Sequence, residues 1–199
     1  MSVCVLTIRD GRDDVHEESL ATLIQQSPEP EYHVSIDDRS HELGFAGAIA
    51  KGWREVLATG TDYVFHHEAD FIFNQPVPIE QMIGLLEAQP HLVQVALKRQ
   101  PCNAEEAAAG GIVELHPDDF RERHHGDYVW TEHRRFFTTN PSVYPAALCA
   151  RGWPQVKHSE GIFSHRLFNG DPEAHSCFWG AKWDEPMVEH VGVRVGHGY

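Results

Sequence analysis

Short apolar runs alternate with amphipathic segments through the first half of the chain. The apolar runs are rich in β-branched residues, and the intervening segments carry apolar residues at helical spacing. This pattern predicts strand, helix, strand, helix and strand, in that order, for residues 3–8, 16–26, 32–36, 44–57 and 63–65. Such alternation is typical of βαβ units, in which right-handed crossovers join parallel strands. We therefore expect an α/β fold with a mixed, mainly parallel sheet flanked by helices.

The second half of the chain has a weaker pattern. Residues 79–88, 104–109 and 159–168 predict helices, and residues 92–97 predict a fourth strand. Phe136-Phe137-Thr138 predicts another strand, and alternating valines follow Pro186. Because no repeat or low-complexity linker interrupts the chain, we expect a single domain over residues 1–199.

The composition narrows the function classes. The formal net charge is −14, from 30 acidic and 16 basic residues. This charge disfavours a protein whose surface coats nucleic acid, although a local basic patch such as His133-Arg134-Arg135 is still compatible with it. The four cysteines lack the spacing of a zinc site, and we expect them to be reduced. The apolar start is too short for a signal peptide, and no run has the length of a membrane span, so we expect a cytoplasmic protein without a transmembrane segment.

Charged residues follow the end of each of the first three predicted strands. They are Arg9 and Asp10, Asp37 and Asp38, and Glu68 and Asp70. In open α/β sheets, ligands bind outside the carboxyl ends of the strands, where these side chains would meet. The two carboxylates of Glu68-Ala69-Asp70 suit a hard divalent cation that also binds substrate phosphates, although isolated loop acids of this kind are more often only solvated. The aspartates after the second strand are equally suited to helix capping.

The succession of these motifs resembles the GT-A glycosyltransferases and is most similar to glycosyltransferase family 2. The motifs are Thr7-Ile8-Arg9-Asp10, Asp37-Asp38-Arg39-Ser40, a glycine-bearing helix and Glu68-Ala69-Asp70. The resemblance implies a nucleotide pocket lined by Thr7 and Arg9, with Asp38 or Asp37 at the base and Lys51 near the nucleotide.

The third motif departs from the family's DxD pattern. Glu68 replaces the first aspartate, and the resemblance assigns it to ribose or to a metal-bound water. Asp70 keeps the position that binds the metal.

The resemblance continues beyond residue 150. Family members carry a Glu-Asp pair and then an arginine on one helix, and here Ser159-Glu160 precede Arg166. Aligning Arg166 with that arginine places Glu160 on the aspartate that acts as general base in inverting members, while Ser159 replaces the glutamate. A glutamate at the start of a helix also interacts favourably with the helix dipole, and this alternative stays open.

Near the end of the chain, Val188-Glu189-His190-Val191-Gly192 resembles the family segment whose histidine completes the metal site. The resemblance makes His190 the first choice as metal ligand and His197 the second, with Arg194 near the diphosphate. A single histidine in an alternating strand is otherwise more often structural.

Together these features predict a metal-dependent glycosyltransferase that uses Mn²⁺ or Mg²⁺. It would transfer a sugar, with inversion, from a UDP- or GDP-sugar to the hydroxyl of a protein, a modified nucleic-acid base, a lipid headgroup or a metabolite. Residues 1–100 would form the nucleotide-binding half, and residues 101–199 the acceptor-binding and catalytic half. The alternatives are a nucleotidyltransferase that acts on sugar phosphates and a nucleotide-sugar-binding module without turnover. A histidine-rich metal hydrolase ranks last, because the HxH or HExxH ligand pairs of such enzymes do not occur in the sequence.

Overall fold

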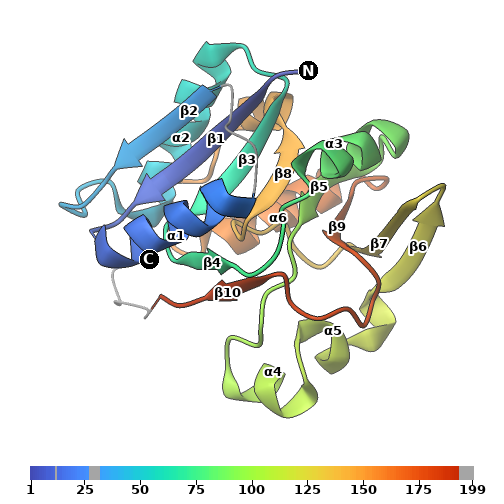
Figure 1. Cartoon of the computed structure of the whole chain (residues 1–199). Coiled ribbons are helices and arrows are strands. Elements are labelled where there is room, and N and C mark those ends of the chain that lie inside the picture. Colours follow the sequence, from blue (N-terminus) through green and yellow to red (C-terminus); the bar gives the residue numbers. More distant parts are fainter. Residues whose placement is uncertain (12, 27–31, 193–199) are drawn as a thin grey trace.

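The computed structural model describes residues 1–11, 13–26 and 32–192, which are built around an eight-stranded sheet (Figure 1). The strand order is β2-β1-β3-β8-β5-β9-β7-β6. These strands are β1 (Val3–Arg9), β2 (Tyr32–Asp37), β3 (Tyr63–Glu68), β5 (Leu92–Ala96), β6 (Arg121–His125), β7 (Tyr128–His133), β8 (Ser142–Pro145) and β9 (His175–Trp179).

The sheet is mixed and mainly parallel, which confirms the fold class expected from the sequence. β1 pairs in parallel with both β2 and β3, and β5 pairs in parallel with β9. β8 runs antiparallel to its neighbours β3 and β5, and β7 runs antiparallel to β9 and β6. Strands from both halves of the sequence thus share one sheet.

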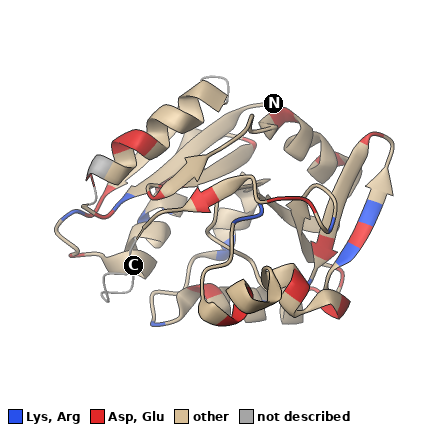
Figure 2. Ribbon diagram, turned by 60° about the horizontal axis from the view of Figure 1, so that its bottom comes forward, with Lys and Arg blue, Asp and Glu red and all other residues tan. Residues whose placement is uncertain are grey.

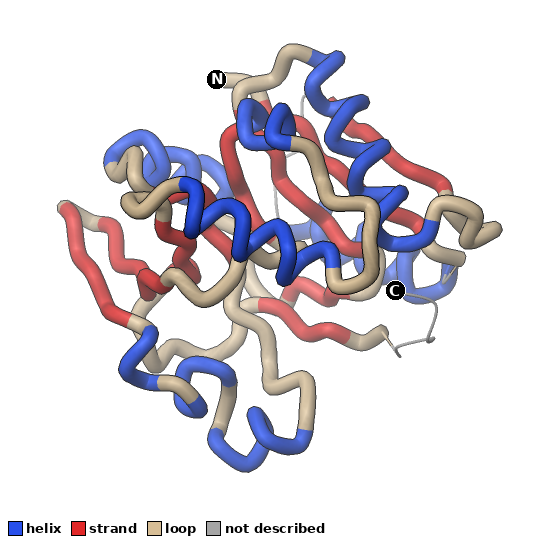
Figure 3. Tube along the Cα trace, turned by 180° about the vertical axis from the view of Figure 1, so that it is seen from behind, coloured by secondary structure: helices blue, strands red, loops and turns tan. Residues whose placement is uncertain are grey.

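Helices cover both faces of this sheet. The helices of the described part of the chain are α1 (Asp13–Gln26), α2 (Gly44–Thr59), α3 (Ile79–Ala88), α4 (Ala104–Ala109), α5 (Ile112–Leu115) and α6 (Ser159–Gly170), with short 3₁₀ turns η1 (Pro117–Asp119) and η2 (Ala146–Arg151). α1 and α3 lie on one face, and the opposite view shows helices over the other face, where α2 and α6 pack (Figures 1 and 3). A second, two-stranded sheet joins β4 (Phe71–Phe73) to β10 (Val188–His190).

The alternation of side chains along β1 explains this layering. Leu6 and Ile8 pack into the cluster that contains the buried residues of α2 and α6, whereas Val5 packs into the cluster of α3. α2 approaches β1 closely at Gly52, where an added Cβ would lie 2.7 Å from the Leu6 Cδ1 atom. A parallel strand covered on both faces therefore reads as a continuous apolar run.

An aromatic cluster holds α2 and α6 against the sheet. The Trp53 ring on α2 lies 5.1 Å, centroid to centroid, from both Trp153 and Phe163, and its Nε1–H donates to the Tyr144 hydroxyl at 3.0 Å. Phe137 contacts the same rings. The cluster places the start of α6 beside the carboxyl ends of the first strands.

The sheet ends in a charged edge strand. All residues of β6 are exposed, and its sequence begins with Arg121, Glu122 and Arg123; Figure 2 shows basic and acidic segments along this edge of the sheet. Charges on an exposed edge discourage pairing with another chain. β6 carries no apolar alternation, which is why the sequence pattern did not predict it.

The strand expected at Phe136-Phe137-Thr138 is wrong. These residues form a loop in which Phe137 is buried and its backbone N–H donates to the Ser164 Oγ atom at 2.8 Å. The strand in this region is β8, which begins at Ser142, directly after Pro141, and ends at Pro145. These two prolines interrupt the apolar pattern. Hydrophobicity at Phe136–Phe137 thus reflects packing rather than strand periodicity.

In the part of the chain that is described, no helix combines the length and the apolar character needed to cross a membrane.

Candidate functional site

A cavity of about 1650 Å³ lies at the carboxyl ends of β1 and β3. From the sheet it is lined by Ile8, Asp10 and the segment Glu68–Phe71. From the other side it is lined by the start of α6 and by the loop 134–140 that precedes β8. This is the place where ligands bind in open α/β sheets.

Two of the predicted metal ligands meet in this cavity. The His190 Nε2 atom lies 2.9 Å from the Asp70 Oδ2 atom. Pairing of β10 with β4 sets this arrangement, because His190 stands opposite Phe71 in the ladder and the Val191 N–H donates to the Asp70 carbonyl at 2.9 Å. The backbone of His190 is also held by the Gln100 amide, which accepts from its N–H at 2.9 Å and donates to its carbonyl at 2.8 Å.

The pair is suited to binding a divalent cation. An ionised carboxylate can only accept, so His190 Nε2–H is the donor to Asp70. A metal bound by both side chains would take the place of that proton, with the ring proton moving to Nδ1. Glu68 lines the same cavity, but among the described residues the one group of three ligand atoms that are close together lies elsewhere, around Glu132. Asp70 and His190 would thus supply two ligands to a cation, with water and substrate oxygens as the others.

Glu160 lies in the same cavity, in the first turn of α6. Its Oε1 atom accepts from the Thr139 N–H at 2.8 Å. Burial raises the pKa of this carboxyl group, and the hydrogen bonds from Thr139 and Thr138 oppose that effect without cancelling it. A carboxylate of raised pKa beside a cavity is typical of a general base. Its place at the N-terminus of α6 agrees with the dipole alternative as well.

The residue before α6 has an unusual backbone conformation. His158 lines the cavity, and its backbone φ of 58° lies in the left-handed region that residues other than glycine rarely adopt. Such conformations concentrate at functional sites, because the surrounding structure must impose them.

Arginines that the sequence analysis did not assign also line the cavity. Arg99 pairs with the buried Glu106 at 3.0 Å, and Arg134 donates to the Phe168 carbonyl at 2.6 Å. Arg135 pairs with Asp119. The neighbouring basic residues 134 and 135 were the available signal, but only the fold brings them to the cavity.

Three of the predicted nucleotide ligands do not line the cavity. The Thr7 hydroxyl is buried in the sheet, 3.0 Å from the His33 Nε2 atom and 3.0 Å from the His67 Nδ1 atom. Arg9 pairs with Asp13 at 2.6 Å. Lys51 lies on α2, 3.9 Å from Glu55. Their roles stay predictions.

The two aspartates proposed for the base differ in environment. Asp37 is exposed and accepts from Arg39, whose guanidinium group and backbone N–H lower the pKa of Asp37 to about 2. Asp38 is buried, and its Oδ1 atom accepts from the Leu43 N–H at 2.9 Å, just before α2. This bond fixes the loop before α2 but is not a side-chain cap of the helix, whose N-cap residue is Leu43. These contacts do not decide which of the two aspartates would bind the nucleotide base.

The remaining predicted residues lie in α6 and at the end of the chain. Arg166 is exposed on α6 and does not line the cavity, which its neighbour His165 does. Arg194 and His197 lie outside the described residues.

Comparison with known proteins identifies the fold. No protein-family model matches the sequence, and no curated protein sequence is similar to it. Among solved structures, S. aureus TarS 1-349 in complex with UDP-GlcNAc superposes with a TM-score of 0.62 at 12% identity, over 100% of this chain and 60% of that one. The complex of TarS 1-349 with UDP gives 0.59 at 12% identity, over 95% and 60%.

The chain has a GT-A glycosyltransferase fold. The longer TarS structure superposes with a TM-score of 0.57 at 9% identity, over 96% of this chain and 37% of that one. The present chain therefore spans the fold but little more than half the length of the TarS 1-349 chains. At this identity the similarity establishes the architecture, and the chemistry depends on the residues in the cavity.

Proposed function

We propose that this chain is a metal-dependent glycosyltransferase that uses a UDP-sugar as donor. The observation that carries the proposal is the convergence of Asp70, His190 and Glu160 on one cavity of a GT-A fold. The donor class follows from the TarS structures, which contain UDP-GlcNAc or UDP. GDP-sugars stay the second candidates.

In this proposal Asp70 and His190 would hold Mn²⁺ or Mg²⁺ through one carboxylate oxygen and one imidazole nitrogen. The metal would supply electrostatic stabilisation of the charge that develops on the leaving diphosphate. Glu68, at the carboxyl end of β3, contacts ribose or a metal-bound water. Arg134, which donates to backbone carbonyls, would add positive charge to the cavity wall and compensate part of the donor's negative charge, whereas Arg99 and Arg135 are paired with Glu106 and Asp119.

Glu160 is the proposed general base. Its carboxylate accepts the proton of the acceptor hydroxyl as the oxygen forms a bond to the anomeric carbon, and the bond from that carbon to the diphosphate oxygen breaks. Attack from the face opposite the diphosphate inverts the anomeric configuration. The Thr139 N–H holds one oxygen of Glu160 and fixes its direction.

Thermal denaturation of the chain with a panel of UDP- and GDP-sugars, each with and without Mn²⁺, tests the proposal. We expect a UDP-sugar to raise the melting temperature only when Mn²⁺ is present. The same panel with Asp70→Asn should give no shift. Metal-independent stabilisation, or none with any nucleotide sugar, would refute the assignment.

The same panel addresses the alternative of a binding module without turnover, for which Ser159 in place of the family's glutamate is the argument. Incubation with a UDP-sugar and Mn²⁺ should release UDP, with water as acceptor in the absence of a better one. Donor binding without UDP release under any acceptor condition would favour the binding module.

A further inference from the structure

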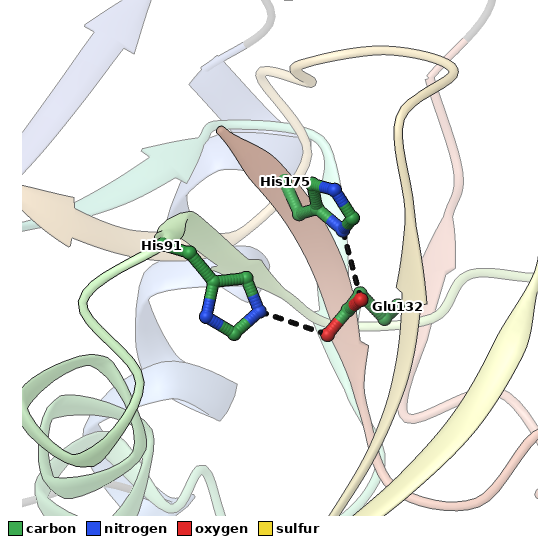
Figure 4. A group of neighbouring side chains, drawn as sticks. All are labelled: His91, Glu132 and His175. Carbon is green, nitrogen blue, oxygen red and sulfur yellow. Dashed lines mark hydrogen bonds and ion pairs between the residues drawn. The ribbon is translucent and has the colours of Figure 1, made fainter. Parts of the chain in front are cut away.

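Three side chains of ligand type converge at a second place in the molecule. His91 lies in the turn before β5, Glu132 lies on β7, and His175 begins β9. The His91 Nε2 atom is 3.0 Å from Glu132 Oε2, and the His175 Nδ1 atom is 2.8 Å from Glu132 Oε1. The three ligand atoms all lie within 4.8 Å of one another, and Figure 4 shows both imidazole rings directed at the same carboxylate.

The pairing of the sheet places these side chains together. β9 lies between β5 and β7, with Leu92 opposite His175 and Glu132 opposite Cys177. The His175 N–H also donates to the His91 carbonyl at 2.9 Å. The ladder therefore fixes the backbone positions of the three residues before any ligand binds.

This cluster is separate from the large cavity. Phe178 of β9 lines that cavity, and His175, three positions earlier on the strand, points to the opposite face. Cys177, on the same face as His175, packs into the core cluster that contains the buried residues of α3. A ligand of this cluster would thus leave the sugar-donor site unobstructed.

The Glu132 carboxylate is largely buried and is held in place by neighbouring side chains. Its side chain is 7% exposed, and the Trp130 Nε1–H donates to its Oε2 atom at 3.2 Å. Arg123, on the exposed strand β6, lies 3.7 Å from Glu132 Oε1.

The two imidazoles complete the set of ligands. Their side chains are 33% and 28% exposed, so water can reach a cation held between them. Two imidazole nitrogens together with one carboxylate oxygen form a ligand set that suits tetrahedral Zn²⁺. Mg²⁺ prefers oxygen ligands and suits a cluster with two imidazoles less well.

We propose that His91, Glu132 and His175 form a Zn²⁺ site with water as the fourth ligand. The metal would replace the two N–H···O hydrogen bonds, and each ring would keep its proton on the nitrogen that faces away from the metal. It would cross-link β7, β9 and the turn before β5, which lie far apart in the sequence. The proposal is independent of sugar transfer.

Zn²⁺ titration of chelator-treated protein, followed by calorimetry, tests the site. The titration uses the Asp70→Asn protein without nucleotide, so that the proposed donor site does not contribute. We expect one equivalent to bind, and His91→Gln or His175→Gln introduced into this protein to abolish that binding. His124→Gln is the matched control, because His124 forms an exposed two-member pair with Glu122. Equal binding by all of these proteins would overturn the proposal.

Two measurements need no substitution in the cluster. At a Zn²⁺ concentration about 100 times the dissociation constant, the melting temperature should rise by about 5–10 °C. Co²⁺ substituted for Zn²⁺ should give the intense visible bands of tetrahedral coordination. Absence of a melting shift together with weak, octahedral Co²⁺ bands would overturn the proposal even if every variant failed to fold.

Discussion

The imidazole of His190 lies 2.9 Å from the carboxylate of Asp70, across 120 residues of sequence. The contact joins the last described strand to the loop that follows β3, and the small sheet of β4 and β10 sets its register. Since the Asp70 side chain is 5% exposed and that of His190 26%, the pair has one protected and one accessible member. This relationship is the geometric basis of the proposed donor site.

Replacing Asp70 by Asn should abolish Mn²⁺-dependent binding of the UDP-sugar, because an amide is a much weaker ligand for a hard cation than a carboxylate. We expect sugar transfer to fall by at least about 100-fold. Activity assays and calorimetric titration of UDP with Mn²⁺ would measure both effects. Asp127→Asn, in the exposed turn between β6 and β7, is the control and should behave as the original chain.

Replacing Glu160 by Gln should retain donor binding and lower the transfer rate by about 10²–10⁴-fold, because the proton acceptor is lost. The rate of the original chain should rise with pH on an acid limb whose apparent pKa lies above 4.5, the ordinary value for glutamate, since burial raises the pKa of Glu160. Glu173→Gln, at an exposed position, should leave the pH–rate profile unchanged. An unchanged acid limb in Glu160→Gln would exclude Glu160 as the base.

The same substitution has a consequence for stability. Because the raised pKa means that folded Glu160 binds its proton more tightly than in the unfolded chain, its contribution to stability falls as the pH rises above 4.5. Glu160→Gln should therefore be at least as stable as the original chain at neutral pH. Urea denaturation measures this, and a marked loss of stability would indicate a structural role instead.

Tyr144→Phe should destabilise the fold by about 1–3 kcal/mol, because it leaves buried polar atoms without partners. The Tyr144 hydroxyl accepts from the Trp53 Nε1–H at 3.0 Å and lies 3.1 Å from the His66 Nδ1 atom. Urea denaturation would measure the loss. Tyr32→Phe removes an exposed hydroxyl and should change the free energy of unfolding little; a similar loss in both variants would refute the explanation.

Acid should destabilise the protein partly through His67. This side chain is buried between the Thr7 and Ser19 hydroxyls, and burial lowers its pKa from 6.5 to about 3. The unfolded chain binds a proton near pH 6.5 that the folded chain does not, so stability is lost as the pH falls from 6.5 towards about 3.

In urea denaturation over that range, His67→Gln should reduce the slope of the free energy of unfolding against pH. The reduction should approach about 1.4 kcal/mol per pH unit. His124→Gln removes an exposed histidine and should leave the slope unchanged. An unaltered slope in His67→Gln would mean that other groups dominate the acid response.

Local periodicity was sufficient to predict much of the first half of the fold. The helix expected at residues 44–57 is α2, which extends to Thr59, and the strand expected at residues 3–8 is β1 with one more residue. These elements bury their apolar residues at their own characteristic period, so each segment carries its own signal. By contrast, β6 and β7 form a hairpin whose outer strand β6 is polar and exposed, and β7 is fixed by pairing with β9, which is distant in sequence.

The residues of the candidate site also fall into those that the sequence predicted and those that only the fold revealed. The order of the motifs and their resemblance to a known family led to Asp70, Glu160 and His190, and the fold brings all three to one cavity. The arginines of that cavity come from loops whose positions only the folded chain defines.

By itself, the sequence determined the alternating strands and helices and the acids at the strand ends, since both follow from residues close together along the chain. The insertion of β8 between β3 and β5 was decided only by the tertiary structure. So was the meeting of His91, Glu132 and His175, because each lies in a different segment without a shared motif. Sheet register is a property of strands paired across long sequence distances, and it brings together side chains that no local pattern connects.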